Sequence, residues 1–293
     1  MIENKIIDGK KIASKIKQEI KTETVDLKSN LKITPGLAFI LVGNNPSSEI
    51  YVNSKSKTCD EVGFFSVTEK LPDNVTKEEI IQLIDSFNKN EKIHGILVQL
   101  PLPVHINELE IIEAIDYKKD VDGFHPENIG RLILGDKCFL PCTPYGITEL
   151  LKRSNIETRG KNTVIIGRSN IVGKPMSNIL IQKQFNCTVS VCHSLTKNIE
   201  DYTLNADLII VAIGKPNYLK SEMIKKDCVI IDVGINRIED AMSKRGYKIV
   251  GDVDFNDCFE KCGKITPVPG GVGPMTIAML IKNTLESAKG NIY

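Results

Sequence analysis

Tyr51 and Lys55 form a residue pair whose types and spacing could do chemistry. A separation of four residues places both side chains on one face of a helix. A lysine beside a phenol can act as an acid/base pair in a partly desolvated site, because burial favours the neutral amine. The same spacing also arises by chance on exposed helices, so a purely structural role is the alternative. Short-chain dehydrogenases share this spacing, but their glycine turn precedes the pair, whereas Gly167 follows it here.

Three further polar residues follow at places where a cleft could form. Gln99 stands at the carboxyl end of an apolar run, where an amide needs a partner or exposure at a cleft. Asp120 and Asp122 lie in a turn-rich loop, where their carboxylates could bind the N–H donors of an amide-like ring. The alternative for Asp122 is turn capping.

The segment Thr163–Pro175 has the order of a strand, a glycine turn and a helix start. In a doubly wound sheet such a turn directs backbone N–H groups at a pyrophosphate. Its glycines, Gly167 and Gly173, do not follow the G-x-G-x-x-G spacing, so a plain strand-to-helix turn remains open. Gly214 and Ile235 follow later strands and are plausible walls of the same dinucleotide site.

The end of the next strand indicates which dinucleotide would bind. An NAD-preferring domain usually places Asp or Glu there, but this strand runs into His193 and Ser194 without a carboxylate. Arg168 follows the first glycine and could pair with a 2′-phosphate. The sequence therefore predicts NADP as the cofactor, with a solvated loop charge as the alternative for Arg168.

A stiff loop, Pro267–Pro274, leads into the final helical pattern, and its backbone could approach a flat ligand closely. It lacks the Lys-Ser/Thr of a phosphate-binding loop. Two cysteine pairs, Cys138/Cys142 and Cys258/Cys262, could in principle hold zinc. Because their spacing is not that of usual structural sites, we interpret them as small buried hydrophobic residues and predict no metal.

Alternating helix and strand patterns must position these residues. The order predicts parallel sheets of the α/β class, with the second half a Rossmann-like doubly wound sheet. Expected strands are Leu37–Gly43, Phe64–Leu71, Gly95–Leu100, Thr163–Ile166, Thr188–Val191, Asp207–Ile213 and Val229–Val233. Expected helices include one carrying Ile12, Ile16 and Ile20, one capped by Ser47 or Ser48 and running to about Val62, one opened by a Thr76–Glu79 capping box, and one over Pro274–Ala288. Residues 116–144 are expected to form loops between two domains, whose cleft would hold ligands.

Composition limits the possible functions. A length of 293 residues suggests about two domains, and the net charge of +1 argues against a nucleic-acid binder. The longest aliphatic run, Leu208–Ile213, is too short to span a membrane. The start lacks the order of a signal peptide, so the eight cysteines are expected to be reduced thiols in a cytoplasmic protein.

Taken together, these segments resemble the bifunctional methylenetetrahydrofolate dehydrogenase/methenyltetrahydrofolate cyclohydrolase family. The matching stretches run in the family's order along nearly the whole chain. They are Tyr51–Lys55, Val98–Pro103, Lys119–Gly123, Pro141–Pro144, Gly167–Gly173, Cys192–Thr196, Gly251–Asp254 and Thr266–Thr276.

The resemblance implies oxidation of 5,10-methylenetetrahydrofolate by NADP+, then hydrolysis of the methenyl product to 10-formyltetrahydrofolate. Lys55 corresponds to the family's essential lysine, Gln99 would hold it, Tyr51 would contact the folate and Asp122 would anchor the pterin. The other folate positions implied are Leu100, Pro101, Pro269 and Gly270. The dinucleotide positions implied are Gly167, Arg168, Ser169, Ile171, His193, Ser194, Gly214, Ile235 and Thr276.

The resemblance also implies a layout and a partner. Residues 1–142, completed by the helix 273–293, would form the folate-binding catalytic domain, and 143–272 the NADP-binding Rossmann domain. Relatives are homodimers joined through that domain, to which the polar segment Asn236–Asp252 could contribute. The family serves one-carbon metabolism in purine, methionine and histidine biosynthesis. The alternatives are a monofunctional NADP-dependent dehydrogenase and a binding module without turnover.

Overall fold

The computed structural model describes residues 5–240, 242–243 and 246–293. The chain divides into two compact units. The first unit comprises Ser14–Cys142 and Ile277–Tyr293, and the second comprises the residues up to Ala13 with Thr143–Thr276. The helices α1 (Gly9–Leu31), α6 (Cys142–Arg153) and α10 (Val272–Ala288) each contain one boundary between the units.

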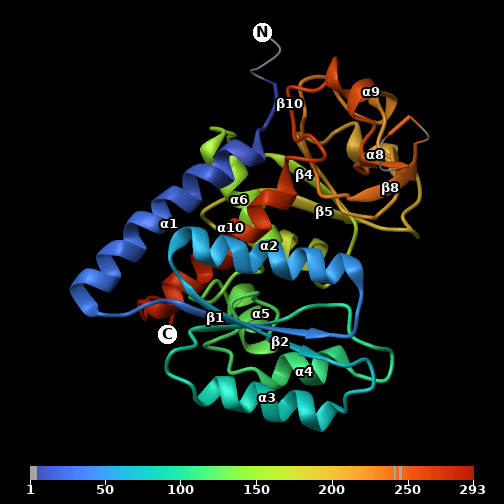
Figure 1. Ribbon diagram of the computed structural model, residues 1–293. Helices are drawn as coiled ribbons and strands as arrows, with labels where there is room; N and C mark the ends of the chain where they lie inside the picture. The colour runs from blue at the N-terminus through green and yellow to red at the C-terminus, as the bar shows by residue number, and fades with distance from the viewer. Residues whose placement is uncertain (1–4, 241, 244–245) are drawn as a thin grey trace. The chain divides into compact units, whose positions relative to one another are not determined.

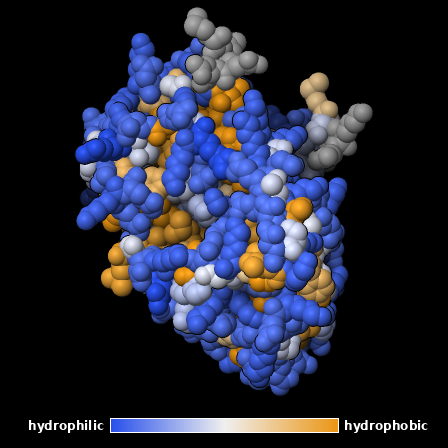
Figure 2. Space-filling model, turned by 90° about the vertical axis from the view of Figure 1, so that its left-hand side faces the viewer, coloured by the Kyte–Doolittle hydropathy of each residue, from blue (hydrophilic) through white to orange (hydrophobic). Residues whose placement is uncertain are grey.

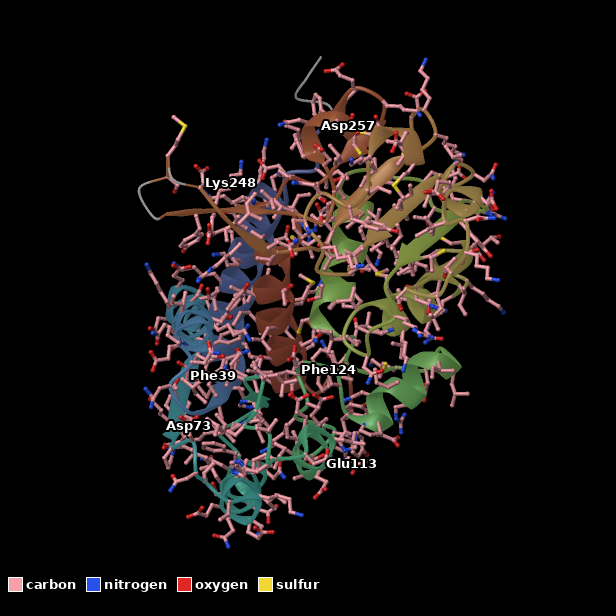
Figure 3. The ribbon with its side chains drawn as sticks, turned by 90° about the vertical axis from the view of Figure 1, so that its right-hand side faces the viewer. Phe39, Asp73, Glu113, Phe124, Lys248 and Asp257 are labelled. Carbon is pink, nitrogen blue, oxygen red and sulfur yellow. The ribbon has the colours of Figure 1, made fainter. Side chains whose placement is uncertain are left out.

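The first unit is built on a parallel sheet with the order β2-β1-β3. Its strands are β1 (Gly36–Val42), β2 (Phe65–Leu71) and β3 (Gly95–Val98). Helix α2 (Pro46–Val62) lies on one face, and α3 (Lys77–Lys89) and α4 (Glu108–Ala114) lie on the other (Figure 1). Every residue of β1 is buried, including Phe39 (Figure 3), because both faces of this central strand are covered.

Local sequence signals explain where these helices begin. The predicted capping box is present: the Thr76 hydroxyl accepts from the Glu79 N–H at 3.2 Å, and the Glu79 carboxylate accepts from the Thr76 N–H at 2.8 Å. The predicted start of this helix after Ser47 or Ser48 is wrong, because α2 begins at Pro46. Asn45 accepts from the Ser48 N–H at 3.2 Å, because Pro46, with its fixed φ, takes the first helical position.

Residues 116–144 are more ordered than expected, and the prediction of loops throughout is wrong. Helix α5 (Pro126–Leu134) lies inside this range, and α6 begins at Cys142. His125 caps α5, and Gly135 ends it in the left-handed conformation with φ of 73°. Pro126 and Gly135 were the available signals, but α5 is too short for a clear apolar periodicity.

The second unit contains a five-stranded parallel sheet with the order β10-β7-β6-β4-β5. The strands are β4 (Asn162–Ile166), β5 (Thr188–Cys192), β6 (Leu208–Val211), β7 (Val229–Asp232) and β10 (Lys264–Ile265). From β4 the chain passes to β5 on one side and then to β6 on the other, so the winding reverses between β4 and β6. The predicted α/β class with a doubly wound sheet is confirmed, and such a reversal point is where open α/β sheets bind ligands.

The second unit also contains shorter elements. Helix α7 (Gly173–Leu180) follows the glycine turn after β4. The antiparallel strands β8 (Asn236–Glu239) and β9 (Tyr247–Val250) form a separate hairpin. The remaining elements are α8 (Glu200–Thr203), the 3₁₀ turn η2 (Ser221–Met223) and α9 (Phe255–Phe259).

The start of the described chain groups with the second unit. Ile6 forms a parallel bridge with Ile265, and the Ile7 N–H donates to the Ile265 carbonyl at 2.8 Å. The Lys10 backbone N–H donates to the Gly270 carbonyl at 2.9 Å. The division into units therefore differs at this end from the predicted domain of residues 1–142, because these pairings tie the segment to β10.

No helix within the described residues is long and apolar enough to cross a membrane. On the face seen in Figure 2 the surface is mostly hydrophilic, and hydrophobic residues occur in separate groups. This distribution is ordinary for a folded domain, since scattered apolar side chains are normal on protein surfaces.

Candidate active site and cofactor site

Lys55 and Gln99 meet at the carboxyl end of β3. Lys55 lies on α2 with only 8% of its surface exposed, and its Nζ donates to Gln99 Oε1 at 2.9 Å. The amide of Gln99 donates in turn to the Leu100 carbonyl at 2.7 Å. The backbone N–H of Gln99 donates to the Ile40 carbonyl at 2.9 Å, and this bond continues the pairing of β1 with β3. Backbone pairing thus fixes Gln99, and Gln99 fixes the lysine.

Tyr51 lies one helical turn before Lys55 on α2 and is 45% exposed. The predicted shared face therefore runs from a partly exposed phenol to a buried amine. A ligand approaching from solvent can contact the Tyr51 ring before it reaches the Lys55 nitrogen.

The two loop aspartates have different surroundings. Asp120 is buried and accepts from the N–H groups of Gly123 (3.1 Å) and His125 (2.7 Å) and from the Asn128 amide (2.9 Å). Asp120 therefore caps the turn formed by the residues that follow it, which is the role suggested above as the alternative for Asp122. Burial raises the pKa of the Asp120 carboxyl, and the hydrogen bonds from the His125 N–H and the Asn128 amide act in the opposite direction.

The Asp122 carboxyl interacts electrostatically with Lys55. Burial raises the pKa of the Asp122 carboxyl, and the positive charge of Lys55 acts in the opposite direction. The Asp122 carbonyl accepts from the Cys142 N–H at 3.3 Å, which anchors the loop to the start of α6. The first unit therefore brings together an amine, an amide and a carboxylate from three segments, a set that can bind and move protons.

The other predicted folate residues fall in two places. Leu100 and the exposed Pro101 follow Gln99 directly in the first unit. Pro269 and Gly270 belong to the second unit, where they line a cavity of about 140 Å³ with Ile235 and Gly273. Ile235, predicted for the dinucleotide, thus shares a cavity with residues predicted for the folate.

The glycine turn after β4 has the geometry of a backbone cradle. Gly167 has φ of 123°, and a Cβ on it would lie 2.2 Å from the Ala212 carbonyl oxygen. A Cβ on Gly173 would lie 2.2 Å from the Gly167 carbonyl oxygen. Both glycines are therefore required by close backbone contacts at the carboxyl end of β4, where a dinucleotide would need backbone N–H groups.

Several predicted dinucleotide residues line one cavity of about 270 Å³ beside this turn. Gly167, Arg168, His193 and Ser194 are among its walls. His193 Nδ1 accepts from the Leu195 N–H at 3.2 Å, so in the neutral ring the proton is on Nε2. Lys215 also lines the cavity and was not among the residues predicted from the sequence. Its only signal was a lysine directly after the glycine that follows β6.

The remaining predicted dinucleotide residues lie outside the described walls of these two cavities. The Ser169 hydroxyl closes the turn by accepting from the Val172 N–H at 3.1 Å. Thr276 shares a hydrogen bond of 3.0 Å with Thr143, and the Gly214 N–H donates to Asp252 at 2.9 Å. Ile171 is 49% exposed.

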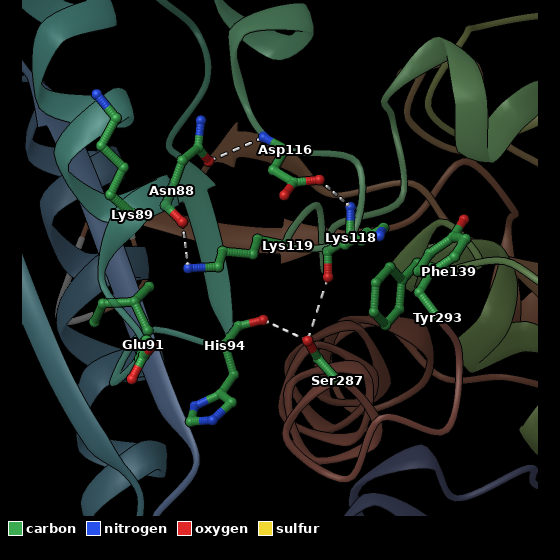
Figure 4. Close-up of a pocket in the computed structure, with 11 residues that line it drawn as sticks. Asn88, Lys89, Glu91, His94, Asp116, Lys118, Lys119, Phe139, Ser287 and Tyr293 are labelled. Carbon is green, nitrogen blue, oxygen red and sulfur yellow. Dashed lines mark hydrogen bonds between the residues drawn. The ribbon is translucent and has the colours of Figure 1, made fainter.

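A cavity of about 410 Å³ in the first unit contains none of the predicted site residues (Figure 4). It lies around His94, at the amino end of β3, whereas Gln99 follows the carboxyl end. Its Lys119 donates to the carbonyls of Phe87, Asn88 and Asn90, which end α3. Lys119 thus ties the start of the aspartate loop to α3 and is a structural residue.

The described residues contain no group of three or more His, Cys, Asp or Glu that could hold a metal. All eight cysteines are buried free thiols. Burial raises the pKa of Cys59, Cys228 and Cys258 to about 12, so these thiols stay protonated at neutral pH.

Comparison with known proteins matches both units to one family. Residues 7–122 match the catalytic domain of tetrahydrofolate dehydrogenase/cyclohydrolase, and residues 141–292 match its NAD(P)-binding domain. The bifunctional protein FolD of Prosthecochloris aestuarii is 54% identical over 286 residues, covering 96% of this chain and 97% of that protein.

Two solved structures extend this result. The bifunctional FolD methylenetetrahydrofolate dehydrogenase/cyclohydrolase of Campylobacter jejuni is 52% identical, with a TM-score of 0.93 and coverage of 97% of this chain and 98% of that one. The Trypanosoma brucei enzyme, solved with NADP and an inhibitor, is 37% identical with a TM-score of 0.93 and covers 98% of both chains. The chain therefore belongs to the tetrahydrofolate dehydrogenase/cyclohydrolase family.

Proposed function

We propose that this protein oxidises 5,10-methylenetetrahydrofolate to 5,10-methenyltetrahydrofolate with NADP+ and hydrolyses the methenyl form to 10-formyltetrahydrofolate. The observation that carries the proposal is the buried Lys55, hydrogen-bonded to Gln99 and acting on the pKa of Asp122, within the catalytic domain of this family.

The oxidative step requires positioning more than a protein base. NADP+, when bound, accepts the hydride that leaves the methylene carbon. The glycine turn at 167–173 fits such a group, because it follows β4 at the carboxyl edge of the sheet and neither glycine has room for a side chain. Arg168, His193 and Ser194 would hold the 2′-phosphate end, and the NADP complex of the Trypanosoma brucei relative supports this cofactor.

The hydrolytic step needs a proton acceptor, and Lys55 fits that role. Water adds to the methenyl carbon and gives up one proton to the Lys55 amine. The added hydroxyl then loses its proton to solvent as the bond from that carbon to N5 breaks, which leaves the formyl group on N10. The released N5 takes up a proton. The positive charge of the methenyl form disfavours an ammonium beside it, which favours the free amine as base.

The neighbours of Lys55 have separate roles. Gln99 Oε1 orients the nitrogen and offers no proton to compete with water. Asp122, with its loop fixed by Asp120, would accept hydrogen bonds from the N–H donors of the pterin ring. Tyr51 would contact the folate from α2, and Leu100, Pro101, Pro269 and Gly270 would line the folate.

An ultraviolet progress curve tests both activities. The purified protein is given 5,10-methylenetetrahydrofolate with NADP+ or with NAD+, and acid quenching converts all formyl product back to the methenyl form. Formation of NADPH with little free methenyl product before quenching is the expected result. Accumulation of methenyl product without hydrolysis would support the monofunctional alternative, and ligand binding without any absorbance change would indicate a binding module.

Lys55→Met separates the two steps. The hydrolytic rate should fall to the uncatalysed rate, while oxidation is partly retained. Lys57→Met, two residues along α2, is the matched control because Lys57 is exposed and lies outside the predicted site. A Lys55→Met variant that hydrolyses the methenyl form at the parent rate would remove Lys55 from the proposal.

We also propose a homodimer formed through the second unit, with the β8–β9 hairpin at its interface. The hairpin supports this, because a two-stranded ribbon is marginally stable alone and Ile238 and Ile249 are only half-buried. Residues 241 and 244–245 of the proposed segment lie outside the described residues. Ile238→Asp should shift sedimentation from dimer to monomer, and an unchanged dimer would exclude this hairpin from the interface.

A cytoplasmic location in one-carbon metabolism, serving purine, methionine and histidine biosynthesis, completes the proposal. The eight free thiols support a reducing compartment.

A further inference from the structure

We propose that Lys215 is a specificity-determining residue that binds the 2′-phosphate of NADP together with Arg168. The inference rests on the proposed dinucleotide site and adds to it a second cation, on a different strand end. It predicts that the preference for NADP over NAD depends on both side chains.

The two cations come from neighbouring strands of the parallel sheet. Arg168 follows β4 and Lys215 follows β6, which pairs directly with β4, and both line the cavity of about 270 Å³. Both side chains are exposed, and neither forms an ion pair with a carboxylate of the described residues. Two unpaired cations in one cavity favour a ligand with a dianionic phosphate.

The turn that carries Lys215 is fixed by hydrogen bonds to a buried carboxylate, that of Asp252. The N–H groups of Ile213 and Gly214 donate to Asp252 Oδ2 at 2.7 and 2.9 Å, and the Asp252 side chain is fully buried. The second oxygen of Asp252 accepts from the Asn236 amide at 2.9 Å. Because Asp252 accepts from the two residues that precede Lys215, the backbone position of Lys215 is well defined.

The Lys215 side chain is also directed. Its Nζ lies 6.0 Å from the centroid of the Tyr218 ring, and that ring lines the same cavity. A cation over an aromatic face is weakly held, so it can turn to a phosphate without breaking a strong ion pair.

The other walls indicate which phosphate would bind. Ile166, Ile199, Ile213 and Tyr218 give the cavity an apolar part that suits a purine. His193 Nε2 and the Ser194 hydroxyl add neutral donors. The combination fits an adenosine carrying a 2′-phosphate better than free inorganic phosphate, which would leave the apolar part uncovered.

Calorimetric titration and steady-state kinetics test the proposal on the full-length protein. The variants are Lys215→Met, Arg168→Met and the double variant, with Lys220→Met as the matched control. Lys220 is an exposed lysine on the same segment and is not among the cavity walls. The probes are 2′,5′-ADP and 5′-AMP, which differ in the 2′-phosphate.

Lys215→Met should weaken 2′,5′-ADP binding about 10- to 50-fold and 5′-AMP binding less than twofold, as expected for one lost charge-assisted hydrogen bond. The ratio of kcat/KM for NADP+ to that for NAD+ should fall by a similar factor, through KM. The KM for 5,10-methylenetetrahydrofolate should not change. Lys220→Met should match the parent protein in every measurement.

Two outcomes would overturn the assignment of Lys215. One is a change of less than twofold in 2′,5′-ADP binding. The other is an equal loss of 2′,5′-ADP and 5′-AMP binding, which indicates a structural role for the turn. The binding arm is independent of turnover, so a protein that discriminates these ligands but does not oxidise the folate would refute the proposed function and leave the role of Lys215 standing.

Discussion

The Nζ of Lys55 and the Oε1 of Gln99 lie 2.9 Å apart, and the Gln99 amide nitrogen is engaged by the Leu100 carbonyl. The second contact decides which end of the amide faces the lysine, since the nitrogen can only donate. The lysine therefore meets an acceptor that is oriented by the backbone at the end of β3.

Replacing Gln99 should separate the two activities. Gln99→Met removes the acceptor and should lower kcat for hydrolysis about 10- to 100-fold, the value of one hydrogen bond to a charged group. Oxidation should fall less, because hydride transfer does not use the amine. Gln99→Glu should move the pH profile of hydrolysis to higher pH, because a carboxylate beside Lys55 favours the ammonium.

Hydrolysis of 5,10-methenyltetrahydrofolate, measured by loss of absorbance between pH 6 and pH 9, checks this prediction. Gln184→Met, on the exposed surface of the second unit, is the control. Equal losses of both activities in Gln99→Met would argue that the residue supports only folding.

Gly173→Ala should abolish dinucleotide binding or destabilise the second unit. Its Cβ would lie 2.2 Å from a backbone oxygen of the glycine turn, so the turn itself would have to move. Gly130→Ala is the contrast. Gly130 lies in α5 with open space around a Cβ, so alanine there should stabilise the protein by about 0.5–1 kcal/mol. Urea unfolding and 2′,5′-ADP titration measure both variants, and a Gly173→Ala variant with parent affinity and stability would contradict the close contact.

Asp252 should be important for stability because it accepts three hydrogen bonds within the interior. Asp252→Ala leaves the N–H groups of Ile213 and Gly214 without an acceptor and should cost about 2–4 kcal/mol. Asp252→Asn keeps one oxygen for these donors, and rotation of the Asn236 amide can restore the third bond. Asn should therefore recover most of the stability in urea unfolding. Equal losses in the two variants would indicate that the negative charge matters, not the acceptor.

Asp232 should make stability depend on pH. Burial raises the pKa of this carboxyl from 3.8 to about 6, although the N–H groups of Gly234, Asp252 and Val253 act against the rise, and the nearby Asp252 charge adds to it. The folded state therefore holds a proton that the unfolded state releases between about pH 4 and 6. Its contribution to stability is present below pH 4 and is lost as the pH rises through about 6.

A shift of this size corresponds to about 3 kcal/mol at most. The free energy of unfolding of the parent protein should fall, relative to Asp232→Asn, by up to that amount between pH 4 and pH 7. Urea unfolding of both proteins at several pH values gives the difference. A constant difference across this range would show that Asp232 titrates alike in the folded and unfolded chain.

The α/β class and the parallel strands could be predicted from the sequence, because these features depend on local patterns. The continuous apolar run Leu37–Gly43 predicts a strand covered on both faces, and β1 is such a strand. The Thr76–Glu79 capping box is complete within four residues. The glycine turn at 167–173 could likewise be predicted, and so could the helix that carries Tyr51 and Lys55 on one face. Family motifs gave the candidate residues for both ligands, and their roles stay predictions.

Similar residues could be told apart only by their contacts in the folded chain. Asp120 and Asp122 look equivalent in the sequence, yet only Asp120 faces the N–H groups of Gly123 and His125, and only Asp122 lies near Lys55. Helix α5 was missed because a short helix depends on its ends more than on periodicity. The start of α2 was misplaced because Asn45, which precedes Pro46, accepts from the Ser48 N–H. Lys215 could not be singled out from the sequence, because its proposed role depends on the pairing of β6 with β4, which places Lys215 and Arg168 at one cavity. Partners that are distant in the sequence set these assignments, and only the folded chain brings them together.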